Sequence, residues 1–257
     1  MDSRALWVKR RLGVMALVAI FVEAMCAEVA APAQAAPAQA SPPPQATASA
    51  PAGREAGTKP PAPGVVRADL ERWRIIDSQS GPVNYYSVQH DAGRAFLRGA
   101  YLPPNKKAVL GFEMPEKSRE RMHHLEWSWR AVKLPVQGDE CSKGKGDSAA
   151  VLYVTWRRFL KWYSLKYVWS TTRPTGTICD RRRNTFVAQD TVVLESGGPT
   201  GVWKREALDL TREFRTHFGE GDERADVPPL MGLGVMTDGD QTKTESTGDY
   251  SDFVLSP

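Results

Sequence analysis

The sequence predicts a mainly β domain, an antiparallel two-sheet sandwich of jelly-roll type with one short helix, preceded by a signal peptide and a disordered linker. Three observations lead to this prediction. Short apolar or alternating segments recur between residues 65 and 257, Gly and Pro turns separate them, and one segment has helical periodicity. Many short strands with a single helix are typical of a sandwich or a jelly roll.

The strands are predicted from their local patterns. Residues 124–132 alternate, with Trp127 and Trp129 on the apolar face, which indicates a half-buried strand. Residues 149–156 and 165–169 are more continuously apolar and predict central strands. The other segments with strand character are 84–89, 95–100, 107–112, 185–194, 203–208, 230–237 and 250–255.

One helix is predicted after residue 208. Asp209 is a good N-cap, and Leu210, Phe214 and Phe218 recur every four residues on one face. Gly219 is expected to supply a left-handed C-terminal stop.

Residues 1–31 have the composition of a secretory signal peptide. A basic start precedes the nine-residue apolar run 14–22, which is too short to span a bilayer. We expect cleavage after Ala31. A lipoprotein site at Cys26 competes with it, but Met25 is the wrong size to precede a lipidated cysteine. The mature chain is therefore expected to be periplasmic or secreted, without a transmembrane span.

Residues 32–64 are predicted to be a disordered linker rich in Pro and Ala, because they contain almost no large apolar side chain. The folded domain is expected over residues 65–257. The formal net charge of +4 falls to +3 once residues 1–31 are removed, which argues against a nucleic-acid partner. The run at 181–183, three arginines, is predicted to be a solvated loop.

Two cysteines, Cys141 and Cys179, remain in the mature chain and meet an oxidising compartment after export. The strands at 149–156 and 165–169 follow one another, so as antiparallel neighbours they bring both cysteines to the same end of a sheet. We therefore expect a disulfide between them, worth roughly 3–4 kcal/mol.

Several motifs together resemble a known family. They include Leu-Glu-Trp-Ser-Trp-Arg-Ala-Val at 125–132, Gly-Val-Met-Thr-Asp-Gly-Asp-Gln-Thr at 234–242 and Gly-Asp-Tyr-Ser-Asp-Phe at 248–253. In this order they resemble the bacterial domain-of-unknown-function family 3047 over about residues 72–255. The resemblance implies a secreted β-sandwich similar to galactose-binding and carbohydrate-binding jelly rolls, with no established activity. The chain departs from the family where Ser148 follows Asp147, since two adjacent acids are usual there.

The acidic C-terminal segment is a candidate structural Ca²⁺ site. Its candidate ligands are Asp238, Asp240, Asp249 and Asp252, and Ca²⁺ accepts six to eight oxygens in irregular geometry. A solvated loop with turn-forming Asp side chains explains the same residues, and both interpretations stay open. No other cofactor is indicated.

Aromatic residues crowd into the middle of the domain and suggest a platform for sugar rings. Residues near the predicted loop at 157–164 are expected to be exposed, whereas Trp127 and Trp129 are expected in the core. The candidate ligand-binding residues are Trp156, Trp162, Tyr163, Trp169, Arg130 and Glu126, the last two as hydrogen-bonding partners of hydroxyl groups.

The favoured function is non-catalytic binding of a glycan or cell-envelope polysaccharide. The histidines lie in no recognisable Ser/His/Asp or zinc pattern, so the sequence names no catalytic residue. A carbohydrate-active hydrolase on the same fold, which requires two convergent carboxylates, and an envelope scaffold with a flat apolar patch are the alternatives.

Overall fold

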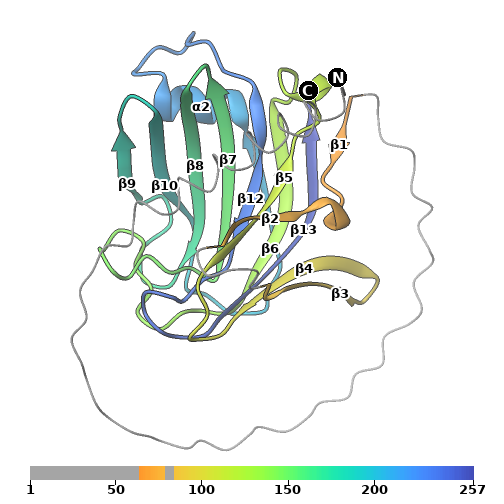
Figure 1. Cartoon of the computed structure of the whole chain (residues 1–257), viewed down its shortest axis with the longest axis vertical. Coiled ribbons are helices and arrows are strands. Elements are labelled where there is room, and N and C mark those ends of the chain that lie inside the picture. Colours follow the sequence, from red (N-terminus) through yellow and green to blue (C-terminus); the bar gives the residue numbers. More distant parts are fainter. Residues whose placement is uncertain (1–63, 79–83) are drawn as a thin grey trace, which may run out of the picture.

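The computed structural model describes residues 64–78 and 84–257, which form a sandwich of two sheets (Figure 1). The predicted fold class is confirmed. Among the described pairs, the strands run antiparallel except β8 and β10, which are parallel. The expectations for residues 1–31 and for nearly all of 32–64 lie outside the described residues. Within the described residues, no helix is long and apolar enough to cross a membrane.

Sheet A has the strand order β11-β6-β13-β4-β3. β1 pairs with the C-terminal part of β13, at Val254 and Leu255. Its strands are β1 (Val66–Arg67), β3 (Tyr86–Asp91), β4 (Arg94–Tyr101), β6 (His124–Lys133), β11 (Lys204–Asp209) and β13 (Ser246–Ser256).

Sheet B has the order β2-β5-β12-β7-β8-β10-β9. Its strands are β2 (Arg74–Ser78), β5 (Ala108–Glu113), β7 (Ala150–Arg158), β8 (Lys161–Ser170), β9 (Ile178–Arg183), β10 (Val187–Ser196) and β12 (Leu230–Met236). Two short 3-10 helices, η1 (Leu70–Arg72) and η2 (Glu116–Ser118), lie between strands.

The core lies between the sheets and is dominated by aromatic rings. Trp127 and Trp129 of β6 point inward, as their alternation predicts, and both are 0% exposed. They meet Tyr167 and Trp169 of β8, at ring-centroid distances of 6.4 Å for Trp127–Tyr167 and 6.0 Å for Trp129–Trp169. These contacts fix the two sheets face to face.

Helix α2 (Leu210–Phe218) packs over one end of the core, next to β7 and β8 (Figure 1). The side chain of Asp209 accepts a hydrogen bond from the backbone N–H of Arg212, so the predicted N-cap is confirmed. The expected left-handed conformation of Gly219 is wrong, because Gly219 has φ −80° and continues the helical turn, and the positive φ falls on Glu220 instead. Phe214 lies edge-on to Trp156 and Tyr163, with centroids 5.5 and 5.1 Å apart.

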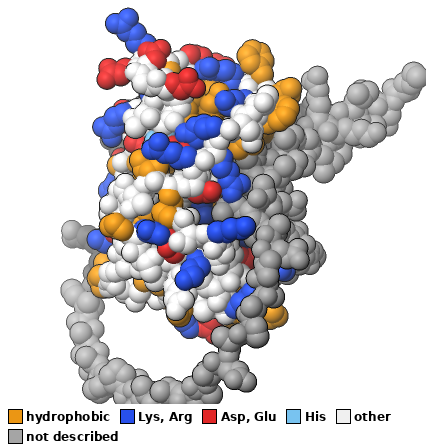
Figure 2. Space-filling view, turned by 90° about the vertical axis from the view of Figure 1, so that its left-hand side faces the viewer, with side chains coloured by type: hydrophobic (Ala, Val, Ile, Leu, Met, Phe, Trp, Pro, Cys, Tyr) orange, Lys and Arg blue, Asp and Glu red, His pale blue; other side chains and the backbone are white. Residues whose placement is uncertain are grey.

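Strands β1, β2 and β9 were not predicted. The expectation of a loop at the three arginines is wrong, because Arg181–Arg183 belong to β9. Among the described residues, β9 is an edge strand that pairs with β10 alone, so charged side chains are tolerated there. Arg183 forms an ion pair with Asp190 at 2.7 Å. Figure 2, which shows the left-hand side of Figure 1, where β9 and β10 lie, has many Lys and Arg side chains across that side.

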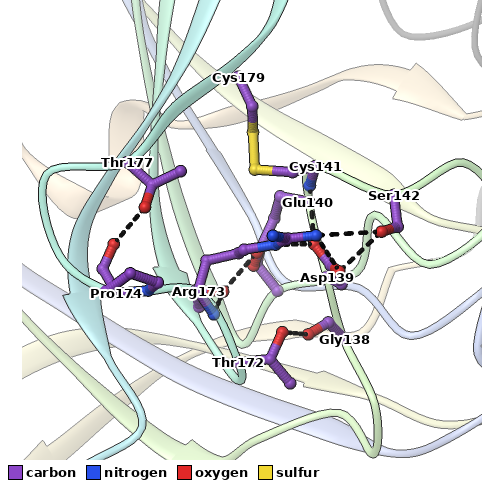
Figure 3. A network of polar contacts seen from close by, with 12 residues as sticks. Gly138, Asp139, Glu140, Cys141, Ser142, Thr172, Arg173, Pro174, Thr177 and Cys179 are labelled. Atoms are coloured by element: carbon purple, nitrogen blue, oxygen red, sulfur yellow. Dashed lines mark hydrogen bonds and ion pairs between the residues drawn. A yellow bond between two sulfur atoms is a disulfide. The ribbon is translucent and has the colours of Figure 1, made fainter.

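The predicted disulfide between Cys141 and Cys179 is confirmed, with Cα atoms 5.4 Å apart (Figure 3). It joins the loop before β7 to strand β9. Beside it, Arg173 donates hydrogen bonds to both carboxylate oxygens of Asp139, from Nε at 2.6 Å and Nη2 at 2.7 Å. The two links hold the 134–149 loop against the end of sheet B.

Candidate functional site

The outward face of sheet A carries a set of charged and aromatic side chains. In β4, β6 and β13 the inward positions are apolar, so the intervening residues face away from sheet B. The strand register places Asp249 of β13 opposite Arg98 of β4 and Arg130 of β6. Three strands that lie apart in the sequence therefore supply one ionic group.

Asp249 is the centre of this group and is 0% exposed. Its Oδ1 accepts a hydrogen bond of 2.7 Å from Arg98 Nε, and its Oδ2 accepts bonds from Arg98 Nη2 at 2.8 Å and Arg130 Nε at 2.7 Å. A buried carboxylate with two guanidinium partners is a rigid element rather than a free ligand. It holds the arginine side chains in fixed positions.

Two aromatic rings lie against these arginines. Phe96 and Trp203 meet edge-on with centroids 5.6 Å apart. The guanidinium carbons of Arg94 and Arg130 each lie 4.6 Å from the Trp203 ring centroid. Cation–π contacts of this kind orient both the ring and the cations. Trp203 is half-buried, so part of its surface stays accessible.

A hollow of about 460 Å³ adjoins this group, between β1, the turn from β3 to β4, and β13. Its charged lining residues are Arg67, Asp69, Arg94 and Asp252. We call it the Arg94 hollow. Its volume is in the range of sites that bind small molecules.

Arg94 is incompletely bonded in this hollow. Its Nη2 lies 3.5 Å from Asp252 Oδ2, while its Nη1 is buried without an acceptor among the described residues. Asp252 has φ +57° in the irregular part of β13 between Ser251 and Val254, which turns its carboxylate toward the hollow. A buried donor without an acceptor and an Asp with left-handed backbone in a strand each raise the free energy of the folded state.

The aromatic residues that the sequence suggested as a platform are mostly in the interior. Trp156, Trp162 and Trp169 are each 1% exposed, so the expected exposure of Trp156 and Trp162 is wrong. β7 runs to Arg158 and β8 starts at Lys161, so the expected loop is a tight turn and both residues lie within strands. Tyr163, half-buried, packs against Phe214 and Phe218.

The two polar candidates do lie on the outward face of sheet A. Arg130 belongs to the group around Asp249, and Glu126 pairs with Arg205 of β11. Sequence reasoning missed Phe96 and Trp203. One signal was available, because Arg94, Phe96 and Arg98 alternate with residues of the inward face of β4.

A second cluster lies at the end of sheet B where β7 begins and β12 ends. One carboxylate oxygen each of Asp147, Asp238 and Asp240 lies within 4.8 Å of the other two. Asp147 Oδ2 accepts hydrogen bonds from the backbone N–H and the hydroxyl of Thr242, at 2.6 and 2.7 Å. Asp238 Oδ1 accepts one of 3.0 Å from the N–H of Ser148.

The electrostatics of this cluster centre on Asp238, which is 1% exposed. Burial raises its pKa well above the ordinary value, and the charges of Asp147 and Asp240 raise it further. Lys166 and Lys107 act in the opposite direction.

Of the four predicted calcium ligands, the structure brings only Asp238 and Asp240 together. Asp249 is bonded to its two arginines and Asp252 faces the Arg94 hollow, because both lie along β13 beyond the loop. Asp147, which was not among the four, joins the cluster instead. It precedes β7, and only the pairing of β7 with β12 brings it there.

Comparisons with known proteins identify a family and distant structural likenesses. Residues 71–254 match the model of the family described as "Protein of unknown function (DUF3047)". A search of curated proteins finds no match.

Three solved structures with similar folds illustrate the distant likeness. The xyloglucanase domain of NopAA, a type three effector from Sinorhizobium fredii, in complex with cellobiose has 9% identity and a TM-score of 0.41, covering 76% of this chain and 98% of that one. Endoglucanase 3 of Trichoderma harzianum, from family GH12, has 10% identity and a TM-score of 0.37, and the match covers 67% of this chain and 82% of that one. The K3 cleaved adhesin domain of Lys-gingipain from Porphyromonas gingivalis has 12% identity and a TM-score of 0.34, and the match covers 75% of this chain and 98% of that one. At these TM-scores the likeness supports no conclusion about function.

Proposed function

The chain belongs to the DUF3047 family of proteins of unknown function, and we propose that it is an exported, non-catalytic module that binds a glycan at the Arg94 hollow. The observation that carries this proposal is a hollow lined by two Arg and two Asp side chains, in which the Arg94 side chain is 37% exposed and lies 3.5 Å from its ion-pair partner Asp252. Guanidinium groups donate to sugar oxygens and carboxylates accept from sugar hydroxyls. Such a lining suits neutral, hydroxyl-rich ligands.

The surrounding residues support a preformed site. The ring of Trp203 contacts Arg94 and Arg130, and Asp249 holds Arg130. Side chains fixed before binding lose less conformational entropy when the ligand arrives. Trp203 does not line the hollow itself, but its contact with Arg94 holds that side chain at the edge of the hollow.

Glycoside hydrolysis is less well supported, both at the Arg94 hollow and at the cluster of Asp147, Asp238 and Asp240. Asp69 accepts a hydrogen bond from the N–H of Glu71 as the N-cap of η1, and Asp252 lies beside Arg94. These are structural roles rather than those of an acid and a nucleophile. Asp147, Asp238 and Asp240 do lie close together, but they are at most 6% exposed, so a polysaccharide has no access to them.

Export of the protein is part of the proposal. The signal-peptide composition of residues 1–31 and the disulfide between Cys141 and Cys179 both suit an oxidising compartment. The Pro/Ala-rich linker at 32–64 would then act as a spacer that holds the binding domain away from a membrane or wall surface. Cell-envelope polysaccharides are the glycans nearest to such a protein.

A glycan array that includes bacterial envelope polysaccharides tests the proposal. We expect the purified protein to bind a subset of glycans, and we expect Arg94→Ala to reduce that binding at least about tenfold, the cost of one lost charged hydrogen bond. Arg224→Ala, in an exposed loop after α2, is the matched control and should bind as the unmodified protein does.

A folded protein that binds no glycan would contradict the proposal. So would binding that Arg94→Ala leaves unchanged, because the site would then lie elsewhere on the domain.

A second candidate function is attachment to an anionic membrane surface through the turn between β7 and β8. Phe159 and Leu160 of that turn are 89% and 67% exposed, and nearby Phe186 is 59% exposed. Arg158 and Lys161 flank the turn. Exposed apolar side chains with basic neighbours are typical of surfaces that enter the headgroup layer.

Sedimentation with vesicles distinguishes this candidate from glycan binding. The protein should sediment with vesicles rich in anionic lipid, and the double variant Phe159→Ser with Leu160→Ser should not. Unchanged sedimentation of the double variant would exclude the turn as the contact.

A further inference from the structure

Three carboxylates from two distant parts of the chain meet away from the Arg94 hollow. Asp147 precedes β7, whereas Asp238 and Asp240 follow β12. They are 0%, 1% and 6% exposed, and one oxygen of each lies within 4.8 Å of the other two. Negative charges this close and this far from water repel one another unless a cation or protons neutralise them.

The hydrogen bonds of the cluster leave one oxygen without a partner. Asp147 is bonded by the backbone N–H groups of Gln241 and Thr242, and Asp238 by that of Ser148. The Oδ1 of Asp240 is buried and has no donor among the described residues. A buried carboxylate oxygen without a partner is costly, and here it belongs to a side chain that faces two further carboxylates.

The neighbouring positive charges offset the cluster only in part. Lys107 and Lys166 are 3% and 5% exposed, and both influence Asp238. A third ammonium group, that of Lys243, donates a hydrogen bond to the backbone carbonyl of Asp240 and not to its carboxylate, so the three carboxylates still face one another in a buried region. A divalent cation would neutralise these acids and satisfy the free oxygen at the same time.

We propose that Asp147, Asp238 and Asp240 bind a calcium ion. Ca²⁺ takes oxygen ligands at about 2.3–2.6 Å in irregular geometry, so one ion can bridge three oxygens of this spacing, whereas Mg²⁺ requires about 2.0–2.1 Å and a regular octahedron. Backbone carbonyl groups or water complete the coordination. The ion would tie the segment before β7 to the loop between β12 and β13.

Calorimetric titration of the metal-free, full-length chain with CaCl₂ is the direct test. We expect a Kd of about 10⁻⁴–10⁻³ M, the range of extracellular calcium modules. Terbium luminescence gives an independent signal through Tyr101, which lies near enough for the charges of all three carboxylates to raise its pKa, after the larger effect of burial. Calcium should also raise the Tm, because only the folded chain forms the site.

Asp240→Asn is the most informative variant, because its Oδ1 makes no hydrogen bond that the substitution would break. Calcium and terbium affinity should fall by roughly tenfold or more. Asp226→Asn is the control, since this acid is 88% exposed and lies outside both the cluster and the Arg94 hollow. It should bind as the unmodified chain does.

Absence of calcium binding and of a Tm shift in the unmodified chain would overturn the proposal, and would mean that lysines and protons balance the acids. Equal affinity in Asp240→Asn would also overturn it. If that variant does not fold, the Tm of the unmodified chain in calcium and in chelator decides. Glycan binding is measured in a separate assay, so the calcium proposal and the glycan proposal can be contradicted independently of each other.

Discussion

Arg130 donates a hydrogen bond of 2.7 Å from Nε to Oδ2 of Asp249, a carboxylate with no exposure to solvent. Because Arg98 shares the same carboxylate, one acid compensates two cations on the outward face of sheet A.

The first prediction is that Asp249→Asn lowers the free energy of unfolding by about 3–5 kcal/mol, because it leaves Arg130, only 13% exposed, without its counter-charge. Urea unfolding measures this change. Asp252→Asn, on the same strand but 51% exposed, should cost about 0.5 kcal/mol or less. Equal losses in the two variants would show that the ionic group contributes little.

The second prediction concerns acid stability. Hydrogen bonds from Arg173 lower the pKa of Asp139 from 3.8 to about 2. A depressed pKa in the folded state stabilises the fold above the ordinary pKa, and the contribution is lost as pH falls from about 4 toward 2. The urea midpoint should therefore decline over this range, and Asp139→Asn should flatten that decline. Asp226→Asn, whose side chain is 88% exposed, is the control and should keep the full decline.

The third prediction concerns the disulfide. The bond between Cys141 and Cys179 closes a loop with a sequence separation of 38 residues. Replacing both by Ser should lower the free energy of unfolding by about 3–4 kcal/mol, because the unfolded chain gains conformational entropy. Urea unfolding of the double variant and of the reduced unmodified protein should give similar losses. A loss well below this range would indicate that the Arg173–Asp139 pair already holds the loop.

The fourth prediction separates stability from binding at Trp156. This side chain is 1% exposed and lies 5.5 Å, between ring centroids, from Phe214 of α2. Trp156→Ala should cost about 3–5 kcal/mol in thermal or urea unfolding, and the fraction that remains folded should bind glycan as the unmodified protein does. Loss of binding in a fully folded variant would return Trp156 to the candidate site.

The local pattern of the chain was enough to predict most of the fold. Alternation in residues 124–132 determines which side chains of β6 face the core, because successive strand residues point to opposite sides. For the same reason it placed Arg130 and Glu126 on an outward face. The strand order around Cys141 and Cys179 was sufficient to predict their disulfide. β9 escaped prediction because an edge strand can carry charged residues that resemble a loop.

The sequence by itself therefore determined the fold class, the helix with its N-cap, the disulfide and the direction in which most strand residues point, since each depends on neighbours along the chain or on one strand pairing. Only the tertiary structure decided which acids meet. Asp147 and Asp238 are brought together by the pairing of β7 with β12, whereas Asp249 and Asp252 are separated from them by the length of β13. Exposure of Trp156 and Trp162 was likewise decided by packing, because an aromatic residue near a turn is equally suited to the core and to a surface until its neighbours are in place.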